Sequence, residues 1–288
     1  METCTPDIAV HLHLYYPHMW ERIKNRLINM ADYPYHLYVT MPPENEYLAN
    51  EIKAFHFPTT VYIVENCGYD VGPFIYFLNH IKPEEYDFII KIHTKSDKSG
   101  DDTLINKKYL NRKFWSEQLV DALIGSKKIF ERNLRAFIKD QTIGMIGSKY
   151  CITSQYKNGP LIENKANEVM QKLGSKMRLP ITFVAGTMFM IRGKILQKLR
   201  GAYKIEDFAV TDGKIKDGTL AHAVERVFGC MVTAEGYKIK GFDYNILFEI
   251  NNKIKSLKRF IYQKKITNSG FLQIKIFKIT VYRKKTLY

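Results

Sequence analysis

Three potential cations, Lys91, His93 and Lys95, recur at every second position of the stretch "YDFIIKIHTKSD". The apolar run just before them, Phe88 to Ile90, predicts a buried strand. Because side chains alternate between the two faces of a strand, all three cations would lie on one face. Burying positive charge is costly unless a partner offsets it, so the pattern indicates a site that binds an anion.

A second candidate stretch, "ENCGYDVGPF", carries two glycines between a predicted strand and a predicted helix. Gly68 lets the backbone turn tightly beside a ligand, and Asp70 is placed to cap the helix that follows. The start of a helix favours an anion, whereas the acid itself would hold a base or a ribose. A plain turn from strand to helix is the alternative, and no P-loop signature is present.

Two histidines, His11 and His13, share one face of the predicted strand "DIAVHLHLYY". With His93 or His222 as a third ligand they would form a zinc site. Because neither Cys nor a carboxylate stands at ligand spacing, hydrogen-bonded histidines of a core or crevice are the alternative.

Two later stretches, "AGTMFMIR" and "DGTLAHAVERVFG", also carry polar groups of interest. Gly186 and Thr187 allow a substrate close to the backbone, and Arg192 is available for an anionic group. Asp217 begins a predicted helix, where it would act as a general base or simply as a cap. His222 and Glu225, three residues apart, share one face of that helix.

Strand and helix patterns alternate through the first two hundred residues and place these stretches. The strand patterns cover 7–16, 35–40, 59–66, 86–93, 142–148 and 181–193, and the helix patterns cover 20–30, 74–81, 114–125, 128–139 and 217–229. This alternation predicts an α/β fold whose mainly parallel sheet is covered by helices on both faces. Ligands of such sheets bind beyond the carboxyl ends of the strands, where residues 66–68 and 91–95 would meet.

The composition is that of a soluble globular protein, with 288 residues, 45% hydrophobic and 25% charged. The sequence contains no run of 18 apolar residues that would span a bilayer, and its start has no basic segment followed by an apolar one, which argues against secretion. The four cysteines lie far apart, as expected for a reducing cytoplasm.

Positive charge is concentrated at the end of the chain. The net charge is +15 and eleven Lys and Arg follow Glu249 with no acidic residue among them, so residues 1–249 carry about +4. The sequence therefore predicts a body, 1–249, and a basic amphipathic tail, 250–288. In "KIKSLKRFIYQKK" apolar residues share one helical face, which would bind anionic lipid at about 1 kcal/mol per nearby cation. A solvated tail is the alternative, and nucleic acid is not expected because the body is nearly neutral.

Taken in order, five stretches resemble the rhamnan synthesis F family of bacterial polysaccharide glycosyltransferases: "VHLHLYYPHMW", "ENCGYDVGPF", "YDFIIKIHTKS", "GTMFMIR" and "DGTLAHAVERVFG". The resemblance covers roughly residues 7–235. It implies a GT-A-like nucleotide-binding fold and transfer of rhamnose or another hexose from a nucleotide-sugar to a lipid-linked O-antigen, capsule or rhamnan. It also implies a cytoplasmic enzyme, peripheral on the inner face of the plasma membrane through its basic tail.

The resemblance also assigns residues to sites. Donor-binding positions would be His11, His13, Asn66, Gly68, Asp70, Lys91, His93 and Lys95, and acceptor-binding positions Gly186, Thr187, Met188, Phe189 and Arg192. Two positions depart from the family pattern. Cys67 stands where a basic residue is common, and Met190 where Trp is common.

Metal and base are the remaining parts of the implied site. Most GT-A enzymes use an Asp-x-Asp metal motif, and no such spacing occurs in this sequence. We therefore expect Lys91, His93 and Lys95 to neutralise the leaving diphosphate without a required cofactor. If Mn²⁺ or Mg²⁺ is used instead, Asp97, Asp101 and Asp102 become the expected ligands.

The expected catalytic residues are Asp217, as the base of an inverting transfer, with His222 and Glu225; the pair Glu206-Asp207 is the second choice for the base. Two other classes of function stay open at this point. One is a zinc-dependent hydrolase using His11 and His13, and the other is a non-enzymatic binder of anionic polymer.

Overall fold

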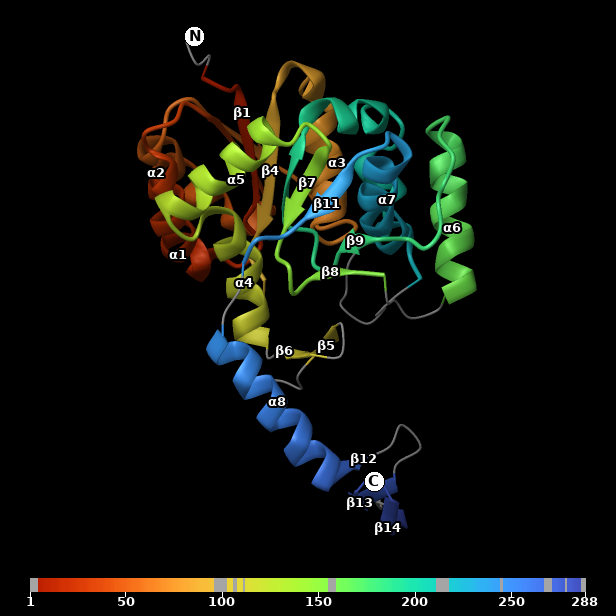
Figure 1. The fold of residues 1–288 in the computed structure, drawn as a ribbon. Helices are drawn as coiled ribbons and strands as arrows, with labels where there is room; N and C mark the ends of the chain where they lie inside the picture. The colour runs from red at the N-terminus through yellow and green to blue at the C-terminus, as the bar shows by residue number, and fades with distance from the viewer. Residues whose placement is uncertain are drawn as a thin grey trace.

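The computed structural model describes residues 5–95, 103–105, 108–110, 112–154, 159–210, 218–243, 246–266, 271–277 and 279–285. Its centre is a seven-stranded sheet in the order β11-β7-β10-β4-β1-β2-β3 (Figure 1). The bounds of these strands, in chain order, are β1 Ile8–His13, β2 His36–Met41, β3 Thr59–Ile63, β4 Phe88–His93, β7 Ile143–Gly147, β10 Phe189–Arg192 and β11 Lys238–Lys240.

The sheet is mainly parallel, as the alternating pattern predicts. β4, β1, β2 and β3 all run in the same direction, and β11 runs parallel to β7. β10 is antiparallel to both of its neighbours. It starts level with the end of β4, because Phe189 pairs with Lys91, and then runs back along that strand.

Helices cover the sheet on both faces, and the α/β prediction is therefore confirmed. α3 (Val71–Asn79) and α7 (Leu220–Ala234) pack together on one face, with α6 (Gly159–Lys172) outside α7. α1 (Trp20–Leu27), α4 (Arg112–Ile124) and α5 (Lys127–Lys139) lie on the other side (Figure 1). The body also contains α2 (Ala49–Phe55), several 3-10 helices and the short strands β5 Thr103–Ile105, β6 Lys108–Leu110, β8 Ile152–Thr153 and β9 Phe183–Val184.

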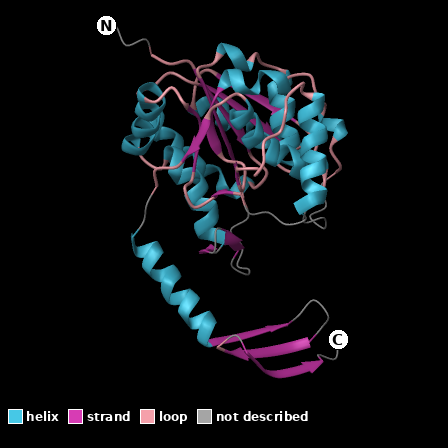
Figure 2. Ribbon diagram, turned by 45° about the vertical axis from the view of Figure 1, so that its right-hand side comes forward, coloured by secondary structure: helices cyan, strands magenta, loops and turns pink. Residues whose placement is uncertain are grey.

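The C-terminal region consists of one long helix and a small separate sheet, which extend away from the body (Figure 2). α8 (Ile246–Ile261) leads into β12 (Tyr262–Ile266), β13 (Phe271–Ile276) and β14 (Ile279–Lys285), which form an antiparallel sheet. The tail helix was expected, but it begins at Ile246, so the predicted boundary at 249 falls inside it. The three strands were not predicted. Among the described residues, no helix is both long and apolar enough to cross a membrane.

Candidate active site

The parallel register brings the polar residues of three strands together at the carboxyl end of the sheet. His11 pairs with Lys91 and His13 with His93 between β1 and β4, while Thr40 of β2 lies beside His13. Paired residues point to the same face, so these side chains form one polar patch within a buried sheet. The structure places Lys91 and His93 at the carboxyl end of the sheet, as expected.

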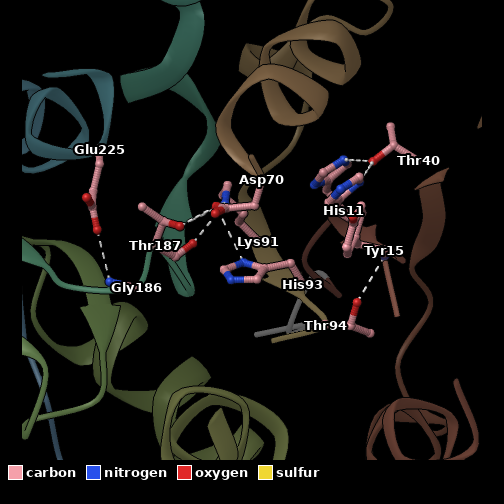
Figure 3. A network of polar contacts seen from close by, with 11 residues as sticks. His11, Tyr15, Thr40, Asp70, Lys91, His93, Thr94, Gly186, Thr187 and Glu225 are labelled. Carbon is pink, nitrogen blue, oxygen red and sulfur yellow. Dashed lines mark hydrogen bonds and ion pairs between the residues drawn. The ribbon is translucent and has the colours of Figure 1, made fainter. Parts of the chain in front are cut away.

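A buried lysine organises the centre of this patch. The Lys91 side chain is 1% exposed, and its ammonium donates to Asp70 Oδ2, to the Thr187 carbonyl at 3.0 Å and to Thr187 Oγ1 at 3.2 Å. An ammonium has three N–H donors, so all of them are used within the protein. We refer to Asp70, Lys91, His93 and Thr187 as the Asp70 cluster (Figure 3).

The turn before β10 is fixed by this cluster on one side and by α7 on the other. Thr187 accepts from Lys91 and donates its own hydroxyl to Asp70 Oδ2. Its φ of 48° is rare for a β-branched residue, which indicates strain that surrounding contacts must hold. Gly186, with φ 94°, donates its N–H to Glu225 Oε1 at 3.0 Å.

The electrostatics of the cluster favour one carboxylate facing one ammonium. Burial opposes ionisation of Asp70, but nearby positive charge and hydrogen bonds from Lys91 and Thr187 outweigh it and hold the pKa of Asp70 well below its usual range. Burial, with the charge of Lys91, holds the pKa of His93 well below its usual value. At neutral pH His93 is therefore uncharged, and its Nδ1 lies 3.4 Å from Asp70 Oδ2.

The prediction that Lys91, His93 and Lys95 together form a cationic row for an anion is thus wrong for Lys91 and His93. The charge of Lys91 is offset by Asp70, and His93 is neutral. The ammonium of Lys95 lies 4.0 Å from the centre of the Trp115 ring, beyond the end of β4. The physical reason is that an ammonium inside a sheet needs a paired anion, which here comes from the protein itself.

The turn that leads into α3 supplies this anion. Gly68 and Tyr69 both have positive φ, of 71° and 58°, and these values direct the chain sharply into α3. Asp70 occupies the N-cap position, yet its side chain makes no capping hydrogen bond, because its carboxylate faces Lys91. Gly68 donates its N–H to the carbonyl of Ala209 at 3.0 Å, so residues 208–210 lie against the turn.

His11 and His13 share one hydroxyl partner. His11 Nε2 lies 3.0 Å and His13 Nδ1 3.1 Å from Thr40 Oγ1. His11 is sealed under α3, with its ring centre 4.8 Å from that of Phe77, and it is fully buried. The structure thus gives both histidines hydrogen-bonded positions in the core and places His11 out of reach of a ligand. Among the described residues, no group of three or more His, Cys, Asp or Glu is arranged to hold a metal.

For three residues, the predicted role in acceptor binding is wrong. Met188 and Phe189 are 0% and 1% exposed, and both belong to the hydrophobic core. Arg192 pairs with Phe88, the first residue of β4, and so lies at the opposite end of the strands from His93. Its guanidinium donates to the carbonyls of Ile143 and Phe137, which makes it a structural residue.

The expected catalytic helix does lie beside the site. His222 Nδ1 is 2.7 Å from Thr219 Oγ1, and its ring centre is 5.4 Å from that of Tyr69. Both oxygens of Glu225 are engaged, one by Gly186 and the other by Arg226, so this residue fastens the turn before β10.

Several other candidates fall elsewhere. Asp217, and the alternative metal ligands Asp97, Asp101 and Asp102, lie outside the described residues. Asn66 precedes the turn and is half-buried. In the second-choice pair, Asp207 Oδ2 accepts from the N–H of Lys204 at 2.8 Å. Sequence reasoning missed the pairing of Lys91 with Asp70, although a lysine in an apolar strand is itself a signal that an acid lies nearby.

The buried histidines predict a specific loss of stability in mild acid. Burial lowers the pKa of His13 to about 4, and it lowers those of His11 and His93 well below the ordinary value. As the pH falls from about 6.5, the unfolded chain binds protons that the folded chain refuses, so the free energy of unfolding decreases. We expect a slope approaching about 1.4 kcal/mol per pH unit for each ring, measured by urea unfolding between pH 7 and 4.5. The low pKa of Asp70 acts only below this window.

The variant His13→Gln should reduce this slope by the contribution of one ring, about 1.4 kcal/mol per pH unit. Its matched control, His18→Gln, removes an exposed ring instead. Stability that does not change between pH 7 and 4.5 would contradict the neutral state of the buried histidines.

This chain is similar in sequence to two curated proteins and was also matched to a solved structure. Two curated relatives, both uncharacterised proteins named WxcX from strains of Xanthomonas campestris pv. campestris, are 26% identical over 253 residues. The match covers 83% of this chain and 33% of each relative, so the chain spans about a third of their length. Among solved structures, glucosyl-3-phosphoglycerate synthase from Mycobacterium tuberculosis, in complex with phosphoglyceric acid, is 12% identical with a TM-score of 0.35; the match covers 97% of this chain and 89% of that one.

The family assignment rests on a match over most of the body of the fold. The model of the family described as rhamnan synthesis protein F matches residues 2–237, which include every strand of the seven-stranded sheet except β11. The chain belongs to the rhamnan synthesis protein F family.

Proposed function

We propose that this chain is a glycosyltransferase domain. It moves rhamnose or another hexose from a nucleotide-sugar donor to a growing, lipid-linked cell-surface polysaccharide. Membership of the rhamnan synthesis protein F family supports the class of reaction. The observation that carries the proposal is the ionised Asp70 carboxylate at the carboxyl edge of a mainly parallel sheet, where α/β folds bind ligands.

Asp70 is the group of its cluster that a donor can reach. Its side chain is 19% exposed, against 1% for Lys91 and 5% for His93. An ionised carboxylate accepts hydrogen bonds and does not donate them, so it suits the hydroxyl groups of a ribose or a sugar. In this proposal Lys91 keeps Asp70 ionised and oriented and does not bind phosphate.

A variant pair separates the role of Asp70 in binding from its role in stability. Asp70→Asn leaves a buried ammonium unpaired and should lower the free energy of unfolding by about 3–5 kcal/mol. The double variant Asp70→Asn/Lys91→Met removes both charges and should recover much of that loss. Both variants should lose the rise in unfolding midpoint that dTDP-, UDP- or GDP-sugars give the unchanged chain.

A double variant that recovers stability and still responds to a nucleotide-sugar would contradict donor binding by Asp70. A chain that responds to none of these donors, yet binds anionic polymer in a salt-dependent manner, would contradict the proposed function.

We further propose that transfer needs no divalent metal. The leaving nucleoside diphosphate carries negative charge that fixed cations or a metal must offset. In this proposal the cation that faces the diphosphate is Lys95, which follows the end of β4 and has its ammonium 4.0 Å from the centre of the Trp115 ring. Release of nucleoside diphosphate from a donor should therefore continue in EDTA at an unchanged rate. Release that stops in EDTA and returns with Mn²⁺ would refute this and point to Asp97, Asp101 and Asp102.

Asp217 is our proposed base for an inverting transfer. It immediately precedes Gly218 in the sequence and comes shortly before α7, on which His222 lies beside Tyr69 of the turn that leads into α3. A base there would take the proton of the acceptor hydroxyl as it attacks the anomeric carbon. Asp217→Asn should slow transfer by about 10²–10⁴-fold while donor-induced stabilisation is kept. Asp207→Asn is the matched control, and if it alone slows transfer, the assignment moves to the Glu206-Asp207 pair.

We also propose a cellular location for the enzyme. A lipid-linked acceptor would hold the enzyme at the inner face of the plasma membrane, as a peripheral protein of the cytoplasm.

A further inference from the structure

α8 carries an apolar stripe on its solvent-exposed side. Large apolar residues recur along it at intervals of four, four, three and four, which places them on one face. These residues are Ile246, Ile250, Ile254, Leu257 and Ile261, and their exposed fractions are 57%, 47%, 46%, 60% and 42%. We refer to them as the α8 stripe.

The opposite side of α8 is the side that anchors it to the body. Phe248 stacks on Phe114, with ring centres 4.1 Å apart, and packs edge-on against Tyr150 at 4.7 Å. Asn252, one turn further along the same side, is 6% exposed. At 100° per residue these two positions lie roughly opposite the stripe. The docked side therefore leaves the α8 stripe facing away from the body.

The small sheet after α8 also gathers exposed apolar residues on one face. Leu272, Ile274 and Ile276 alternate along β13 and therefore share one face. The register adds Tyr262 and Ile279 opposite Ile276, and Tyr282 opposite Ile274. Tyr262, Ile279 and Tyr282 are 51%, 69% and 43% exposed. The register places two lysines on the same face, Lys264 opposite Ile274 and Lys284 opposite Leu272, so this face also combines exposed apolar side chains with positive charge.

The positive charge of this region indicates which kind of partner would bind its exposed apolar surfaces. All eleven charged residues after Glu249 are Lys or Arg. On α8, Lys253 and Lys258 lie at the two edges of the stripe, because in a helix of 100° per residue they are about 20° beyond Ile246 and about 40° beyond Ile254. A second copy of this chain would bring the same positive excess, which opposes self-association. Nucleic acid would match the charge but would leave the aliphatic stripe in water.

We propose that α8 and the sheet β12-β13-β14 bind the surface of an anionic phospholipid bilayer. The α8 stripe enters the boundary between headgroups and acyl chains, and the flanking lysines lie at the level of the lipid phosphates. A one-sided apolar stripe with basic edges is the pattern of a helix that lies in the plane of the interface. This inference concerns lipid alone and holds or fails independently of glycosyl transfer.

The test is co-sedimentation of the full 288-residue chain with vesicles. Vesicles of phosphatidylglycerol and phosphatidylcholine should bind the chain at least about tenfold more tightly than vesicles of phosphatidylcholine alone, and added salt should weaken the binding. Ile254→Ser/Leu257→Ser should weaken it by about tenfold or more. The matched control is Ile138→Ser/Leu161→Ser, which changes two residues of similar exposure, 60% and 54%, on α5 and α6 of the body.

A charge variant checks the second half of the proposal. Lys253→Gln/Lys258→Gln should weaken binding to anionic vesicles by about fivefold for each lysine. All of these positions are exposed or lie at the surface, and equal unfolding midpoints would confirm that each variant is folded.

Three outcomes would overturn the proposal. The first is equal binding to both kinds of vesicle, and the second is an α8 variant that binds as tightly as its control. The third is a chain that ignores vesicles and forms dimers in sedimentation velocity, with the dimers lost in Ile254→Ser/Leu257→Ser. That result would identify a second copy as the occupant of the stripe.

Discussion

The ion pair between Lys91 and Asp70 is the constraint on which the rest of the site depends. An ammonium in the middle of a sheet is tolerated only when an anion and further acceptors surround it. Asp70 must therefore turn inward from the start of α3, and Thr187 must present both its carbonyl and its hydroxyl. Thr187 meets this demand with a strained φ, and Glu225 of α7 holds the neighbouring Gly186. One buried charge thus links β4, α3, β10 and α7.

The same pair decides what chemistry the sheet edge can offer. The positive charge of Lys91 is neutralised inside the protein by Asp70. The neighbouring histidines are neutral because burial disfavours their protonated forms. What reaches solvent is a carboxylate held in its ionised state. Such a group recognises hydroxyls, which sugars and ribose have in abundance. In a member of the rhamnan synthesis protein F family, this arrangement favours recognition of a nucleotide-sugar through its hydroxyls at this position.

Periodicity in the sequence predicts the elements well and their partners poorly. The alternation that places Phe88–His93 on a strand and 74–81 on a helix is local, so it can be read directly from the order of residues. The pairing of Lys91 with Asp70 is not local, since it depends on which helix packs over which strand. Arg192 shows the same limit: its position at the far end follows from the antiparallel direction of β10, which no local pattern specifies. Met188 and Phe189 are apolar, and sequence alone does not distinguish a sugar-binding surface from a core. The strands after α8 had a visible signal, the alternation of Leu272, Ile274 and Ile276, which the lysine-rich composition obscured.

The most direct measurement is a crystal structure of the chain with a nucleotide-sugar bound. The account predicts a ribose or sugar hydroxyl within hydrogen-bond distance of the Asp70 carboxylate, with Lys91 still paired to Asp70 and Thr187. A diphosphate in contact with Lys91, or a donor bound away from the carboxyl edge of β1 and β4, would contradict it.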